Sequence, residues 1–477
     1  MYLRFLGIFC LVIIISFSSF AQEGAKIKPR SLGKDIKVFQ SDSGDKESLT
    51  PEDIDEPSGE ITLRRALSLA LIKNPELRAF SWEVRAREAQ ALQAGLPPNP
   101  EISFELEDFG GNGSVEGFDG TETTVLLSQL IPLGGKLSKR RNVEKLNTDL
   151  AQWDYEAVRL NVLTQTTLSY LKVLAAQQKF SLELELVKLA EKVHSVVSER
   201  AREGEISPIE EKRSKVALSQ TRIELERTRR ELDAVRRELA SMWGGKVPQF
   251  EKAAGSLDSV SPIPSFEELS DLLSQNPDIA RWAAEMEQRE AALKLERANA
   301  IPDPFISGGY RHISERGDNA FVVGLSIPIP VLNRNQGAIS QARRRLKKSV
   351  EERNNAEVVV NAALAGTYQN LSASYAEVIL LKHDLLPEAE SAYKSIFEGY
   401  REGKFTLLDV LDAQRTVFNA ELQYIEALLS YHSSRANVER LTGTPLEEIQ
   451  SNVANNSQLM RGKTEYQSSM SDGGEIQ

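Results

Sequence analysis

The sequence predicts a mainly α-helical protein with a smaller β portion, in which a unit of helix, β-hairpin, long helix and returning helix occurs twice. Three observations lead to this fold class. Short motifs recur in the same order 198 to 204 residues further along the chain. Two stretches of more than 60 residues keep heptad-like apolar spacing, and Pro387 is their only proline. Four segments of nine or ten residues alternate apolar and polar side chains, as strands with one apolar face do.

Composition narrows the class of protein. The 477 residues include 58 basic and 69 acidic side chains, and this acidic balance argues against a nucleic-acid partner. Residues 1–21 have the pattern of a signal peptide, with Arg4 ahead of an apolar run and a small-x-small cleavage site ending at Ala21. Cleavage there would remove Cys10, the single cysteine, so we expect an exported protein without disulfides.

The repeated motifs define the domain organisation. After the signal peptide, residues 22–60 form a polar leader that we expect to be mobile, and residues 448–477 form a similar polar tail. The first repeat spans 61–247 and the second spans 262–447. Ordered matches over such a length indicate a duplicated unit and not a short-period solenoid.

Each repeat is read in the same order. An opening helix is interrupted at Asn74-Pro75 in the first repeat and at Asn276-Pro277 in the second. The strands are expected at about 101–109 and 121–130, then at about 305–313 and 319–328, and the long helices at about 136–201 and 338–400. At 1.5 Å per residue each long helix would span roughly 90–100 Å, which no compact domain needs.

Both long helices end at a matched turn. Gly204 and Gly403 are natural left-handed C-caps, and each is preceded by Arg-Glu. The segments 207–210 and 406–409 then carry N-capping signals for a returning helix. Each repeat therefore contains an antiparallel helical hairpin whose tip is the Arg-Glu-Gly turn.

The strands have the length and one-sided apolar pattern of outer-membrane β-strands. Backbone in lipid cannot leave an open sheet edge, so such a sheet must close. Four strands are too few, because known barrels start at about eight, and closure would therefore require other copies of the chain. A cyclic trimer would supply twelve strands. The alternative is a small sheet that caps a soluble helical bundle.

At these residues the chain resembles the TolC-type outer-membrane efflux proteins, over nearly all of 61–447. Residues 325–337, with 400–405 and 408–414, resemble the branch that serves heavy-metal and other cation efflux, including cobalt-zinc-cadmium resistance. The resemblance implies a homotrimer with a 12-stranded outer-membrane β-barrel on a long periplasmic α-helical barrel. It also implies contact with outer-membrane lipids, a periplasmic membrane-fusion adaptor and an inner-membrane RND-type pump.

The function that this resemblance implies is a passive channel in the outer membrane of a Gram-negative bacterium, without enzyme activity or cofactor. Divalent heavy-metal cations are the substrates that the branch favours. Two alternatives stay open, namely an exit duct for drug efflux or type I protein secretion, and a soluble periplasmic coiled-coil scaffold.

Asp409 and Asp412 match an Asp-x-x-Asp pair that lines the periplasmic pore constriction in the resembled family. Three copies would place six carboxylates around one narrow axis, where they would attract cations and raise one another's pKa. The simpler interpretation is that Asp409 completes a capping box and that Asp412 is a solvated or salt-bridged surface acid.

Tyr400 matches a family tyrosine that tethers the closed tip to an acid on a neighbouring hairpin, and Glu210 is the local candidate for that acid. Packing of Tyr400 at the tip and capping by Glu210 explain both residues equally well. A family arginine expected close to Phe405 is missing, and Lys404 is the nearest substitute.

The resemblance makes the two turns the adaptor-docking tips, although a glycine there also serves simply to end a helix. The residues are Arg202, Glu203 and Gly204 with Arg401, Glu402 and Gly403.

Two further features are less informative. Basic residues beginning at Lys136 and at Arg334 follow the hairpins, and we interpret them as solvated helix faces in preference to lipid head-group sites. The four histidines lack metal-ligand spacing, so no resident metal site is predicted.

Overall fold

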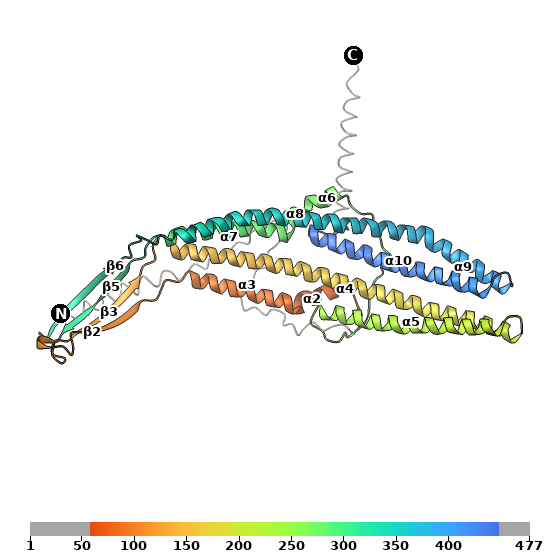
Figure 1. Cartoon of the computed structure of the whole chain (residues 1–477), viewed down its shortest axis with the longest axis horizontal. Helices are drawn as coiled ribbons and strands as arrows, with labels where there is room; N and C mark the ends of the chain where they lie inside the picture. Colours follow the sequence, from red (N-terminus) through yellow and green to blue (C-terminus); the bar gives the residue numbers. More distant parts are fainter. Residues whose placement is uncertain (1–57, 448–477) are drawn as a thin grey trace, which may run out of the picture.

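The computed structural model describes residues 58–447 as a long rod, with a β-sheet at one end and the tips of two helical hairpins at the other (Figure 1). The predicted signal peptide, the predicted tail and all but the last three residues of the predicted leader lie outside the described residues. The mainly helical fold with a four-stranded sheet agrees with the fold class expected from the sequence.

The two halves of the chain contain corresponding elements. The first half comprises β1 (Gly59–Ile61), α2 (Leu63–Lys73), α3 (Pro75–Ala94), β2 (Glu101–Glu107), the short 3₁₀ turn η1 (Gly113–Val115), β3 (Glu122–Leu130), α4 (Lys136–Arg202), α5 (Pro208–Ser241) and β4 (Phe250–Ala253). The second half comprises α6 (Phe266–Asp271), the 3₁₀ turn η2 (Leu272–Gln275), α7 (Pro277–Asn299), β5 (Phe305–Ile313), β6 (Asp318–Ser326), α8 (Gln336–Leu380), the π-helical turn η3 (Leu381–Leu385), α9 (Leu386–Arg401) and α10 (Leu407–Thr442).

In each repeat the opening helix is interrupted at an asparagine that occupies a corresponding position. Asn74 caps α3, with its side chain accepting a hydrogen bond from the Leu77 amide at 3.0 Å, and its amide group donates to the Met242 carbonyl at 2.8 Å. Asn276 caps α7 in the same way and donates to the Leu441 carbonyl at 2.8 Å. One asparagine in each repeat thus starts a helix and fixes it to the end of that repeat's last helix.

The four-stranded sheet is antiparallel, in the order β2-β3-β5-β6. Strand β2 ends at Glu107, two residues before the expected end, because Asp108 adopts a left-handed conformation with φ 56°. Strand β6 ends at Ser326, also two residues early, close to Pro328, which has no amide hydrogen to donate to a ladder. Within the described chain β2 and β6 are therefore the sheet's two edges.

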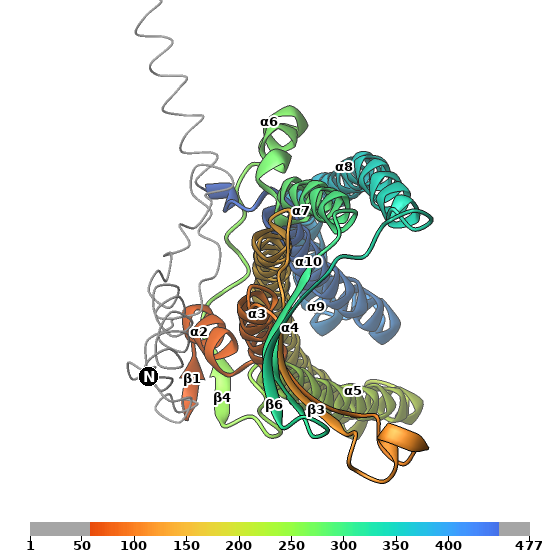
Figure 2. The ribbon, with the colours of Figure 1, turned by 90° about the vertical axis from the view of Figure 1, so that its left-hand side faces the viewer.

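From the sheet to the tips, the long helices form a curved layer (Figures 1 and 2). Helix α4 packs against α5 and α10, and α10 packs against α8 and α9. Nearer the sheet, α3 and α7 pack against α4, and α7 also packs against α8. The main hydrophobic core lies midway along the rod and includes Trp243, Leu364 and Leu428.

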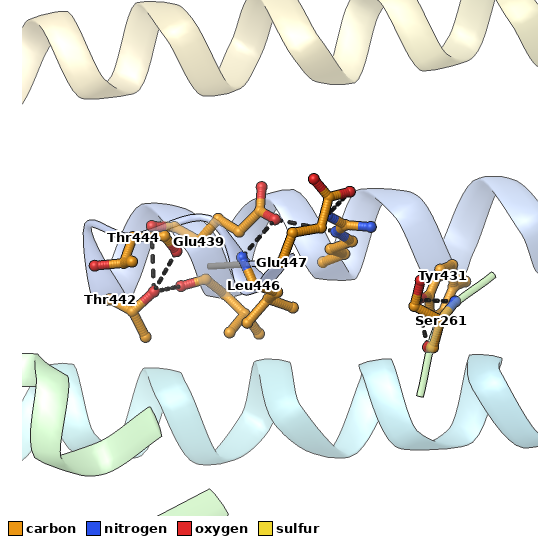
Figure 3. A network of polar contacts seen from close by, with 9 residues as sticks. Ser261, Tyr431, Glu439, Thr442, Thr444, Leu446 and Glu447 are labelled. Carbon is orange, nitrogen blue, oxygen red and sulfur yellow. Dashed lines mark hydrogen bonds and ion pairs between the residues drawn. The ribbon is translucent and has the colours of Figure 1, made fainter. Parts of the chain in front are cut away.

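The linker between the repeats is held by two tyrosines. The Tyr170 hydroxyl donates to the Ala254 carbonyl at 2.5 Å and lies 3.0 Å from the Ile61 carbonyl, where β1 and β4 form a short parallel pair. The Tyr431 hydroxyl contacts both the backbone amide and the carbonyl of Ser261, beside the polar contacts at the end of α10 (Figure 3). The sequence analysis did not predict the pairing of β1 with β4. This pairing places Gly59 and Glu60, at the end of the predicted leader, in a strand.

The second long helix is helical throughout 336–401, in agreement with the helix expected at about 338–400, but it contains a π-helical turn that the sequence analysis did not predict. Pro387 has no amide hydrogen, and its ring would clash with the carbonyl of the residue four positions earlier. A wider π-helical turn at 381–385 precedes it and lets the chain continue in nearly the same direction.

Glu183 is a buried acid on α4 whose Oε2 atom has no hydrogen-bond partner within residues 58–447. Burial raises the pKa of this carboxyl to about 6, with a further contribution from Glu224 and opposition from Lys179. Because the folded-state pKa lies above the ordinary value, ionisation of Glu183 costs stability as the pH rises through about 6.

We therefore expect Glu183→Gln to stabilise the protein at pH 8, by up to roughly 2 kcal/mol, and to have little effect at pH 4.5. Thermal unfolding in detergent followed by circular dichroism at both pH values measures this. An equal effect at the two pH values would contradict the assignment of an ionising buried group.

Candidate functional site

One face of the sheet is apolar and exposed. Residues directly opposite each other in an antiparallel pair share a face, so the register aligns Phe104, Val125, Tyr310 and Phe321 in one row. Side chains at Ile102, Leu127 and Val323 form the next row, and Phe321 and Val323 are 80% and 83% exposed. Four strands with this outward face match the lipid-facing side of an outer-membrane barrel.

The opposite face is polar and is organised around Arg311 on β5. Its guanidinium pairs with Glu122 at 2.5 Å and with Glu107 at 3.3 Å, and it donates to the Thr124 hydroxyl at 2.9 Å. Arg311 thus links β2, β3 and β5 across the side away from the apolar face. The sequence analysis missed this cluster, because Arg311 lies 187 to 204 residues from its three partners and only the strand register brings them together.

The junction between sheet and helices corrects one sequence interpretation. Lys136, expected on a solvated helix face, is buried at the start of α4. Its ammonium group pairs with Asp303 at 2.6 Å and donates to the Ile301 carbonyl at 2.5 Å, both in the segment that leads into β5. This ion pair joins the first repeat to the second at the base of the sheet.

At the opposite end, Arg200 on α4 connects the two hairpins. It donates to the Tyr400 carbonyl at 3.0 Å, its guanidinium lies 5.0 Å from the Tyr400 ring centre, and it pairs with Glu205 at 2.9 Å. Tyr400 is buried, and its hydroxyl has no hydrogen-bond partner in the described part of the chain. Burial raises the pKa of that hydroxyl and the Glu210 carboxylate adds to the rise, whereas Arg200 opposes it.

The expected pair of Tyr400 and Glu210 is therefore not hydrogen-bonded within this single chain. Glu210 is close enough to influence Tyr400 electrostatically, but the hydrogen bond between the hairpins at this point comes from Arg200. Sequence reasoning missed Arg200, since an arginine near a helix end more often serves only its own helix terminus.

Asp409 and Asp412 both lie exposed on the first turns of α10. Asp409 accepts hydrogen bonds from the Thr406 hydroxyl at 2.7 Å and the Thr406 amide at 2.8 Å, and these bonds lower the pKa of its carboxyl. It is thus the capping residue that the simpler interpretation described. Asp412 caps nothing, and its carboxylate has no ion-pair partner among the described residues.

The tip glycines are required by backbone conformation. Gly204 and Gly403 have φ values of 80° and 76°, and a Cβ added at either would meet no atom within 4 Å. Arg202, Glu203 and Arg401 are exposed beside them. Glu402 pairs with Lys404 at 2.6 Å, so Lys404 serves its own turn in this chain.

Within residues 58–447 no three His, Cys, Asp or Glu side chains are grouped so as to hold a metal ion. Every helix in that range lacks an apolar stretch long enough for it to cross a bilayer.

A sheet with one apolar face and two open edges, continued by a long helical rod, defines the subunit class of an outer-membrane channel. Residues 66–245 and 269–444 match the family model described as outer membrane efflux protein, and the chain belongs to this family. This match confirms the resemblance drawn from the sequence. The protein is an outer-membrane protein whose large helical portion lies in the periplasm, which excludes the soluble scaffold.

The chain is also similar to individual proteins in sequence and to solved structures in fold. The cobalt-zinc-cadmium resistance protein CzcC of Cupriavidus metallidurans is 33% identical over 412 residues, covering 86% of this chain and 96% of that protein. The nickel and cobalt resistance protein CnrC of the same organism is 27% identical over 301 residues, covering 63% and 70%. The crystal structure of CusC matches with a TM-score of 0.68 at 18% identity, over 85% of this chain and 99% of that chain, and supports the fold.

We expect Arg200→Met to loosen the tips. A hydrogen bond from a charged donor contributes roughly 1.5–3 kcal/mol, so its loss should raise the open fraction of the channel by roughly 10- to 150-fold. Current recordings in planar bilayers measure this fraction. The exposed Arg202→Met is the matched control, and equal effects of the two variants would contradict a specific role for Arg200.

We expect Arg311→Leu to destabilise the sheet by roughly 1–3 kcal/mol, because it leaves Glu107 and Glu122 without their cation. Thermal unfolding in detergent measures the loss. Arg316→Leu, in the exposed turn between β5 and β6, is the control. Indistinguishable melting of the two variants would show that the cluster around Arg311 contributes nothing.

Proposed function

We propose that the protein is the passive outer-membrane duct of a tripartite efflux system and works as a homotrimer. The observation that carries this proposal is the sheet with an exposed apolar face and two unpaired edge strands, β2 and β6. Pairing β6 of one copy with β2 of the next satisfies both edges, and three copies give twelve strands, enough for a barrel. The protein itself performs no chemical step, and transport follows the work of its pump.

The substrate class that we infer is divalent heavy-metal cations. The inference is supported by the similarity to CzcC and CnrC, whose names refer to resistance to cobalt, zinc, cadmium and nickel. It is also supported by the exposed carboxylates of Asp409 and Asp412 near the tip. In a trimer these would form a ring of six carboxylates at the periplasmic constriction, which would attract cations and repel anions.

The partners we propose are a periplasmic membrane-fusion adaptor and an inner-membrane RND-type pump. The adaptor would contact the exposed tips, where the turn at Arg202, Glu203 and Gly204 lies at the same end of the rod as the turn at Arg401, Glu402 and Gly403 (Figure 1). We further propose that Tyr400 and Glu210 take part in holding the tips closed, together with Arg200. Adaptor contact would open the tips by separating the two hairpins.

We expect the double variant Asp409→Asn, Asp412→Asn to lower the ratio of cation to anion permeability severalfold, because it removes the charge of the ring. Asparagine keeps an acceptor for the Thr406 amide, so the start of α10 is preserved. Reversal potentials in a salt gradient across a planar bilayer measure the ratio. The control is Glu76→Gln at the start of α3, far from the tips, and unchanged selectivity of the double variant would refute the constriction.

Growth of a deletion strain tests the substrate class. We expect increased sensitivity to zinc, cadmium, cobalt or nickel, restored by the wild-type gene and not by a chain lacking the tip residues 200–206. Sensitivity confined to dyes, bile salts or antibiotics would contradict metal efflux and favour a drug-efflux duct. A changed set of secreted proteins without any change in sensitivity would favour type I secretion.

A further inference from the structure

The apolar alternation of the lipid-facing side does not end with strand β6. The β6–α8 linker, residues 327–335, joins the sheet to the helical rod (Figure 1). On β6 the outward side chains are Phe321, Val323 and Leu325. Beyond the strand every second residue remains apolar and more than half exposed, namely Ile327, Ile329 and Val331. The linker therefore extends the apolar surface toward the periplasm.

This extension supplies apolar height that β6 lacks. Toward the outer end of the sheet the same face becomes polar at His312 and Asn319, which are hydrogen-bonded at 2.8 Å. From Phe321 to Leu325 a strand tilted by about 40° rises only about 10 Å along the barrel axis, whereas the apolar band of an outer-membrane barrel is about 25 Å tall. Continued as extended chain to Val331, the rise reaches about 25 Å, so the missing height lies on the side of the linker.

The backbone of the linker suits a poorly hydrated environment. Outside a helix or sheet, an amide that meets lipid without a partner is costly. Pro328 and Pro330 have no amide hydrogen, and the Val331 amide donates to the Ile329 carbonyl at 2.9 Å. The amides of the two residues before α8 are also bonded, to side-chain oxygens.

The linker is fixed at both ends, so its conformation is set by the fold. At one end Ser326 pairs with Phe305 in the sheet. At the other, the side chain of Asn335 donates to the carbonyl and to the carboxylate of Glu296 on α7, at 2.8 and 2.7 Å. Between these points Ile329 and Leu332 are 82% and 88% exposed.

The corresponding linker of the first repeat, residues 131–135, is used inside the chain. The Leu133 amide donates to Asp303 at 2.8 Å, and a Cβ added at Gly134 would meet the side chain of Ile301 at 2.7 Å. Leu133 is also less exposed than Leu332 of the second linker. The difference between the repeats indicates that the second linker has a partner outside its own chain.

Charge at the end of the linker identifies the chemistry of that partner. Arg334 directly follows the apolar residues, is exposed, and has no ion-pair partner within residues 58–447. An arginine at the edge of an apolar surface places its guanidinium among lipid phosphates while its stem stays with the apolar side chains. The sequence alone favoured a solvated helix face for the basic run that begins here, but the apolar linker ahead of it favours a head-group contact.

We propose that residues 327–334 insert into the periplasmic leaflet of the outer membrane. The side chains of Ile329, Val331 and Leu332 lie among the acyl chains, and Arg334 binds the phosphate of an anionic phospholipid. The insertion continues the lipid-facing side of the sheet and fixes the depth at which the sheet gives way to the helices. The proposal rests on the outer-membrane location of the protein and not on the number of copies in the channel.

Spin labels at single cysteines test the insertion. Ile329→Cys and, separately, Leu332→Cys are made in the full chain with Cys10→Ala, labelled with a nitroxide and reconstituted into vesicles of phosphatidylethanolamine and phosphatidylglycerol. Collision with oxygen, which concentrates in lipid, is compared with collision with a water-soluble nickel chelate. We expect oxygen accessibility to exceed nickel accessibility severalfold at both positions.

Two labelled positions calibrate the result. Val323→Cys, on the lipid-facing side of β6, should give the same preference for oxygen. Glu351→Cys, exposed on α8 about 22 Å from its first residue, should give the opposite preference.

A charge reversal tests the head-group contact. In vesicles with phosphatidylglycerol, Arg334→Glu should raise the nickel accessibility at Leu332→Cys severalfold, and in vesicles of phosphatidylcholine alone it should have little effect. Arg344→Glu, about 12 Å along α8 from its first residue, is the matched control and should change neither. An equal effect of Arg334→Glu in both kinds of vesicle would overturn the contact with an anionic lipid.

The remaining outcomes separate the possible surroundings of the linker. Nickel accessibility above oxygen accessibility at both linker positions would show that water surrounds the linker, and would overturn the insertion. Low accessibility to both reagents would show that protein, such as the next copy, covers the linker, and would also overturn it. Either result would leave the proposed function intact.

Discussion

The unpaired edges of the sheet are the constraint on which the rest of the structure depends. In hydrocarbon a backbone amide or carbonyl finds no water to bond, so every strand edge must be paired. Here β2 and β6 each leave one side free, and their apolar face is exposed. A single copy of the chain is therefore an incomplete structure in a membrane, and the fold makes sense as one sector of a closed barrel.

Along the helical rod, from the sheet to the tips, polar contacts keep the two repeats in a fixed relative position. The buried pair of Lys136 and Asp303 joins the two repeats at the base of the sheet. Tyr170 and Tyr431 fix the linker between the repeats near the middle. Arg200 joins the two hairpins at the far end. Each is a polar contact between segments distant in sequence, placed where two parts of the duplicated unit must keep their relative position.

Features with a short period were predictable from the sequence. The alternation around Phe321 and Val323 marks a strand because side-chain direction has a period of two, and Gly204 marks a helix end because few other residues adopt its φ. Features that depend on distant partners were not. The residues near Arg311 and Lys136 in the sequence do not indicate which carboxylates form ion pairs with them. The three-residue strand β1 is too short for any periodic signal, and the π-helical turn before Pro387, which contacts α10, has no periodic signal of its own.

In the candidate site, too, local features could be predicted from the sequence, and features that involve several copies could not. The cap made by Asp409 is local, and the motif at 406–409 indicates it directly. A ring of Asp409 and Asp412 is a property of several copies, so one chain contains its components and not its geometry. The same holds for the Tyr400 hydroxyl, which is buried without a partner in the described chain.

The mass of the protein extracted in detergent, measured by light scattering with the detergent contribution subtracted, tests the central claim most directly. Closure of the sheet between copies predicts a complex of three chains. A stable monomer that remains folded and embedded in the outer membrane would contradict it, since the edges β2 and β6 would then tolerate lipid unpaired.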